Sequence, residues 1–68
     1  MEITGTMSAK TGACPAITFS VGSVAFMTNA STRFDNACTS FSNGDKVEVK
    51  GNRASSGPAI VTRLKKEN

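Results

Sequence analysis

Short runs of alternating hydrophobic and polar residues fill this chain, and glycine, serine, threonine and asparagine interrupt them about every ten residues. Leucine occurs once, and no stretch places apolar residues on one helical face for three turns. The pattern predicts five strands, at residues 2–10, 16–21, 24–29, 46–51 and 59–66.

Period-two alternation also predicts which side chains face the interior of the fold. In the first strand Gly5 marks a bend or a close backbone approach. In the third strand, Val24 and Phe26 are preferred to Ala25 and Met27 because of their bulk. The predicted inward residues of the first four strands are Ile3, Gly5, Met7, Ile17, Phe19, Val21, Val24, Phe26, Val47 and Val49.

The last strand allows two interpretations. Ile60 and Leu64 fit period two with Thr62 between them, and this pairing is preferred. Val61 and Leu64 face the same side only if the strand contains a bulge.

Residues 29–45 are too rich in serine, threonine, asparagine and aspartate for regular structure throughout. Phe34 and Phe41 are expected to anchor this connection to the rest of the fold. One short helical turn near residues 36–42 is the most helix that the chain is expected to contain, with Asp35 as its N-cap and Gly44 ending it.

A meander of three strands, a longer connection and a final hairpin predict an all-β fold, a small five-stranded closed barrel. The connection after the third strand lies where an OB-fold has its helix, so the barrel is expected to be OB-like, with an SH3-like barrel as the alternative. The 68 residues are expected to form a single domain, residues 1–68.

The only cysteines are Cys14 and Cys38. A structural zinc site needs four ligands, the chain has no histidine and no C-x-x-C motif, and a nucleophilic cysteine would lack a histidine base. We therefore expect a disulfide, with two buried free thiols as the alternative. It would close a loop of about 25 residues and contribute about 3.5 kcal/mol on the chain-entropy view.

A disulfide indicates an oxidising compartment, so we expect a periplasmic, cell-surface or secreted protein. No apolar run approaches the length of a membrane span, and no signal peptide is visible. A predicted strand follows Met1 at once, which suggests a mature domain cut from a longer precursor with Met1 added. The net charge of +3 is ordinary for a soluble domain.

The carboxylates are scattered over turns, a strand face and the C-terminus, so no acid–base pair is predicted and no catalytic residue is assigned. The oxygen-rich segment "FDNACTSFSNGD" does not have the ligand spacing of an EF-hand loop. We expect no enzyme activity, no cofactor and no metal site.

A resemblance to a known family covers nearly the whole chain. Its features are "ITGTM", then "CPAITFSVGSVAFMTNASTRF", a second cysteine, "NGDKVEVKGN" and "GPAIVTRL". With these motifs the chain resembles the bacterial domain of unknown function 5666. The resemblance implies a small OB-like barrel, export, often as a lipoprotein or tandem module, and no established catalytic residues. Within these 68 residues we expect a single short copy of the domain, and no leader is visible.

Two functions are therefore compared. The first is a non-catalytic exported binding or structural module, expected to be a monomer, that contacts another protein or an envelope component. Its candidate contact residues are Arg33, Phe34, Phe41, Arg53 and Arg63. The second is an OB-like domain that binds single-stranded nucleic acid, which would need aromatic platforms beside a basic groove.

Overall fold

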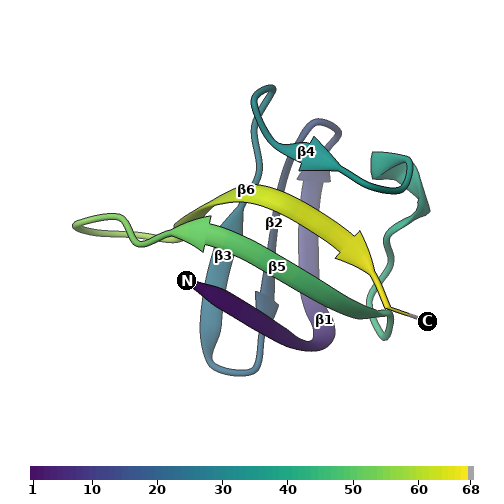
Figure 1. Ribbon diagram of the computed structural model, residues 1–68, viewed down its shortest axis with the longest axis horizontal. Helices are drawn as coiled ribbons and strands as arrows, with labels where there is room; N and C mark the ends of the chain where they lie inside the picture. The colour runs from purple at the N-terminus through teal and green to yellow at the C-terminus, as the bar shows by residue number, and fades with distance from the viewer. Residues whose placement is uncertain (68) are drawn as a thin grey trace.

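The computed structural model describes residues 1–67 and is all-β, with one short 3-10 helix (Figure 1). Residue 68, the last residue of the expected domain, lies outside the described residues. The elements are β1 (Glu2–Ala13), β2 (Ala16–Val21), β3 (Val24–Met27), β4 (Arg33–Phe34), the 3-10 helix η1 (Cys38–Ser40), β5 (Lys46–Asn52) and β6 (Ala59–Lys66).

Five of the strands close into a barrel, as predicted. The order along the sheet is β3-β2-β1-β5-β6, and β3 closes the circle by pairing in parallel with β6. The other four pairings of the barrel are antiparallel. A meander, a long irregular connection and a final hairpin make this an OB-like barrel, and closure covers the strand edges that would otherwise pair with other chains.

Strand β1 serves both halves of the barrel because it bends. Its first residues pair with β5 and its later ones with β2, and a bulge lies between Ser8 and Thr11. Ala9 in the bulge has a φ of 53°. At Gly5 an added Cβ would lie 2.8 Å from the side chain of Val21, so it is a side chain, and not another backbone segment, that lies close to this glycine. The strand continues to Ala13, beyond its predicted end, because pairing with β2 extends a segment of low β-propensity.

The barrel interior holds the inward residues of all five strands. Phe19 and Phe26 stack there with ring centroids 5.6 Å apart. Ile3 and Val24 are partly buried and pack against this core. The buried hydrophobic residues are Met7, Ile17, Phe19, Val21, Phe26, Phe41, Val47, Val49, Ala59, Val61 and Leu64.

The preferred orientation of β6 was wrong. Val61 and Leu64 are buried, whereas Ile60 is only half-buried. The pairing with β5 shifts register between Lys50 and Gly51, which leaves Thr62 as the extra residue of a bulge. This bulge is what the alternative interpretation required.

The connection between β3 and β5 also differs from its prediction. Helix η1 is shorter than residues 36–42, and Ala37, not Asp35, is its N-cap residue, with no side-chain capping bond. Gly44 belongs to a separate turn. The two-residue strand β4 was not predicted, because it forms only by parallel pairing with Arg63 and Leu64 of β6.

Candidate functional site

The disulfide between Cys14 and Cys38 is present, with the two Cα atoms 6.0 Å apart. Cys14 begins the β1–β2 turn, in which its bond to Pro15 is cis, and Cys38 begins η1. The bond therefore ties the tip of the first hairpin to the irregular connection, 24 positions along the chain.

Asp35 is the centre of an ion-pair cluster that holds β4 against β6. Arg63 donates to its carboxylate from Nε at 2.8 Å and lies 2.6 Å away through Nη2, and Arg33 Nε lies 3.6 Å away. The hydrogen bond from Arg63 is the main cause that lowers the pKa of Asp35 below its usual value, against the opposing effect of partial burial. The same pairing raises the pKa of Arg63.

Lys66 fixes the segment around η1 to the end of β6. Its ammonium group donates to the carbonyl of Ser40 at 2.8 Å and lies 3.4 Å from Asp45. Its backbone N–H donates to Asn36 at 3.2 Å. Together with the ion pairs of Asp35, these contacts hold residues 33–45, the part of the connection that runs from β4 to the start of β5, along β6. We call residues 33–45 the strap.

Phe34 and Phe41 anchor this strap, as predicted. Their ring centroids lie 6.3 Å apart, and Phe34 packs against the core. Phe41 is fully buried in the core cluster, so its side chain is not exposed at the surface where a partner would contact it.

The remaining candidate contact residues do not form one surface. Arg33, Phe34 and Arg63 lie together at the β4–β6 pair, where Asp35 offsets the charge of both arginines. Arg53 follows β5 in the β5–β6 loop, which extends to the far left in Figure 1, away from β4 and η1. Within residues 1–67 its side chain makes no hydrogen bond or ion pair.

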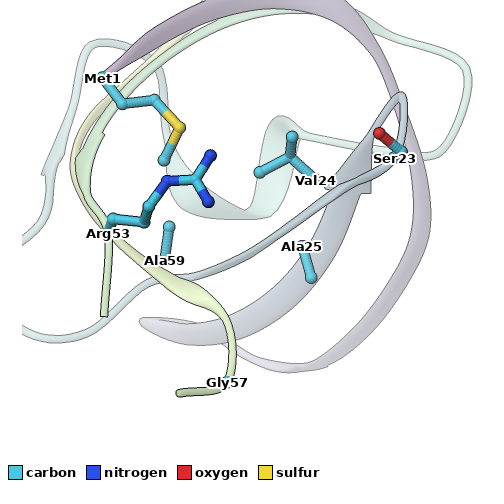
Figure 2. Close-up of a pocket in the computed structure, with 7 residues that line it drawn as sticks. All are labelled: Met1, Ser23, Val24, Ala25, Arg53, Gly57 and Ala59. Carbon is cyan, nitrogen blue, oxygen red and sulfur yellow. The ribbon is translucent and has the colours of Figure 1, made fainter. Parts of the chain in front are cut away.

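Arg53 lines an open cavity of about 330 Å³, which we call the Arg53 cavity. Figure 2 shows its guanidinium group between the side chains of Met1 and Val24. The lining residues are Met1, Ser23, Val24, Ala25, Arg53, Gly57 and Ala59. No sequence signal predicts this site apart from Arg53, because the other residues come from the chain start, the β2–β3 hairpin, the β5–β6 loop and the first residue of β6.

The two sides of the barrel differ in charge. The residues of β2 and β3 that alternate with the buried ones are Ala16, Thr18, Ser20, Ala25 and Met27, and none is charged. The corresponding residues of β5 are Lys46, Glu48 and Lys50, which lie beside charged residues of β6. The charged side carries both signs.

The described residues offer little for metal chemistry. Within residues 1–67 no group of three or more histidine, cysteine, aspartate or glutamate side chains is placed to hold a metal ion. In the same part of the chain no helix is long and apolar enough to cross a membrane.

Comparison with known proteins gives one match. The family model described as Domain of unknown function (DUF5666) matches residues 4–63, which cover β2, β3 and β5 fully and most of β1 and β6. No curated protein matches significantly, and no solved structure does either.

Proposed function

We propose that this chain, which belongs to the family described as Domain of unknown function (DUF5666), is a non-catalytic binding module exported from the cytoplasm. The family description assigns no function, so the proposal is argued from the structure. The observation that carries the proposal is the disulfide between Cys14 and Cys38. Disulfides persist in oxidising compartments and are rare where thiols are kept reduced. They are also typical of small exported domains with limited cores.

The packing of the barrel supports binding at its outer surface. Side chains of all five barrel strands fill the interior, with Phe26, Val47, Val49 and Leu64 fully buried. A barrel of this size has no room for an internal ligand once its side chains fill it. Partners are therefore expected on the strand faces, the loops or the Arg53 cavity.

A non-catalytic role is supported by what the polar side chains do. Asp35 and Asp45 are engaged in ion pairs that fix the strap to β6. Glu2 and Glu67 pair with neighbouring lysines. Four of the five carboxylate side chains within residues 1–67 are thus paired with a lysine or an arginine, which supports a structural role for them.

Fractionation of the host cell tests the proposal. Thiols are blocked by alkylation at the moment of lysis, and the protein is located with an antibody against the folded domain. We expect it outside the cytoplasm with both cysteines oxidised. A cytoplasmic protein with alkylated Cys14 and Cys38 would refute export.

The OB-like strand order favours one alternative, the binding of single-stranded nucleic acid. OB-folds use the face of their second and third strands for this purpose. Here that face has no charged or aromatic residue, and Phe19 and Phe26 stack inside the barrel. We therefore expect no saturable binding of a fluorescent oligonucleotide at low salt, whereas binding that weakens steeply with salt would favour the alternative.

A further inference from the structure

The Arg53 cavity combines an unpaired cation with a lining that is partly polar and partly aliphatic. The other two arginines of the chain both contact the Asp35 carboxylate, whereas Arg53 has no partner within residues 1–67. A guanidinium group presents two parallel N–H donors that fit the two oxygens of a carboxylate. The guanidinium group of Arg53 can therefore bind an anion through these donors.

Local structure places the walls around this group. The N-terminal ammonium of Met1 donates to the Gly51 carbonyl, and the Gly51 N–H donates to the Met1 carbonyl, both at 2.9 Å. These bonds continue the β1–β5 pairing and hold the Met1 side chain beside Arg53 (Figure 2). Val24 and Ala25 enter from β3, and Ala59 enters from β6.

The composition of the cavity restricts its ligand. No carboxylate lines it, so a cation would find no counter-charge. Its one arginine can form two parallel hydrogen bonds to a carboxylate. Its volume of about 330 Å³ is at the lower end for small-molecule sites. The aliphatic part of its lining, Val24, Ala25 and Ala59, leaves space beside Arg53 for a small aliphatic group.

We propose that the Arg53 cavity binds a carboxylate carried on a small aliphatic group. The carboxylate pairs with the Arg53 guanidinium, and the aliphatic group lies against Val24, Ala25 and Ala59. This inference rests on the proposed binding function, and it deepens that function by assigning a site and a ligand class. A free short-chain acid and the C-terminal residue of a polypeptide share this chemistry.

NMR titration of the oxidised, ¹⁵N-labelled protein tests the site. The probe is N-acetyl-L-valine, and N-acetyl-L-valinamide is the matched uncharged control. We expect saturable shifts at the amides of Ser23, Ala25, Arg53 and Gly57, with a dissociation constant on the order of 1 mM for so small a ligand. Equal binding of the amide, no binding, or shifts confined to other residues would overturn the proposal.

Two substitutions identify the interaction. Arg53→Gln removes the charge and is expected to weaken binding of N-acetyl-L-valine about tenfold, because a charge-assisted hydrogen bond is lost. Arg33→Gln makes the same chemical change at a side chain that is 77% exposed on β4, and should leave binding unchanged. Unchanged affinity in Arg53→Gln, or an equal loss in Arg33→Gln, would refute the assignment. The spectra themselves show whether each variant is folded.

Two further ligands distinguish the sources of the carboxylate. Isovalerate represents a free acid, and an acetylated tetrapeptide ending in valine represents a polypeptide C-terminus. Tighter binding of the tetrapeptide than of isovalerate indicates a polypeptide end, and the reverse order indicates a small acid; failure of both overturns the site. Fractionation tests export separately, so either proposal can fail without the other.

Discussion

The Nη2 atom of Arg63 lies 2.6 Å from a carboxylate oxygen of Asp35, and this contact joins the start of the strap to the middle of β6. It is the strongest cause of the lowered pKa of Asp35. The next backbone contact in the same region, from Asp35 N–H to the Leu64 carbonyl at 3.0 Å, continues the β4–β6 pairing.

Asp35→Asn is expected to lower the melting temperature slightly at pH 7, as for other exposed ion pairs. The folded-state pKa of Asp35 lies below its ordinary value of 3.8, so the carboxylate contributes its full stabilisation of the fold above that ordinary value. The stabilisation is lost as the pH falls through the lower, folded pKa. Thermal melts of both proteins from pH 7 to pH 2 should therefore converge at low pH.

Glu67→Gln is the control for the removal of one negative charge. Its melting temperature should stay close to that of wild type, since Glu67 only approaches Lys65 at 3.9 Å. A difference in melting temperature between wild type and Asp35→Asn that persisted at pH 2 would contradict the assigned role of the carboxylate, because the carboxylate is protonated there.

The orientation of β6 predicts an order of stabilities. Val61→Ala removes buried methyl groups and should cost about 2–3 kcal/mol in the free energy of unfolding. Ile60→Ala removes more carbon from a half-buried site and should cost about 1 kcal/mol. Urea unfolding of both variants measures the two values. A larger loss for Ile60→Ala would mean that the last strand faces the other way.

Thr28 carries a buried polar contact at the end of β3. Its hydroxyl accepts the Ile17 N–H at 3.0 Å and donates to the Pro15 carbonyl, and the side chain is fully buried. Thr28→Val keeps the shape but leaves the Ile17 N–H unpaired, at a cost of about 1–3 kcal/mol.

Thr28→Ser retains the hydroxyl and should cost less, about 1 kcal/mol for the lost methyl group. Denaturant unfolding and hydrogen exchange at the Ile17 amide measure both effects. Stability of Thr28→Val equal to that of wild type would show that the hydroxyl is dispensable.

Alternation alone was enough to predict the strands that run regularly through the barrel. Val47 and Val49, or Ile17 and Phe19, face inward as period two requires, because nothing interrupts these strands. In β6 the bulge at Thr62 breaks the period, and it arises from the pairing at Gly51 on another strand. An added Cβ at Gly51 would lie 2.6 Å from the Ile60 carbonyl oxygen, a contact that sequence alone does not reveal.

The candidate site was harder to predict from the sequence than the strands, because most of its contacts join residues that are far apart in the chain. The disulfide could be predicted because two cysteines allow one intramolecular pairing. Asp35 has the local features of an N-cap, yet Arg63, 28 positions away, takes its carboxylate instead. Arg53 could be selected from the sequence by its charge. Its distance in space from Arg33 and Arg63 could not, because it depends on where the β5–β6 loop and the β4–β6 pair lie on the barrel.

The disulfide is the central claim, and its most direct test compares the oxidised protein with Cys14→Ala/Cys38→Ala. Intact mass should first show wild type lighter by two hydrogen atoms before reduction than after it. Loss of the bond should cost about 3.5 kcal/mol and lower the melting temperature by roughly 14–28 °C. Reductant should destabilise wild type and leave the double variant unchanged. Equal melting temperatures for the oxidised wild type and the double variant would contradict the account.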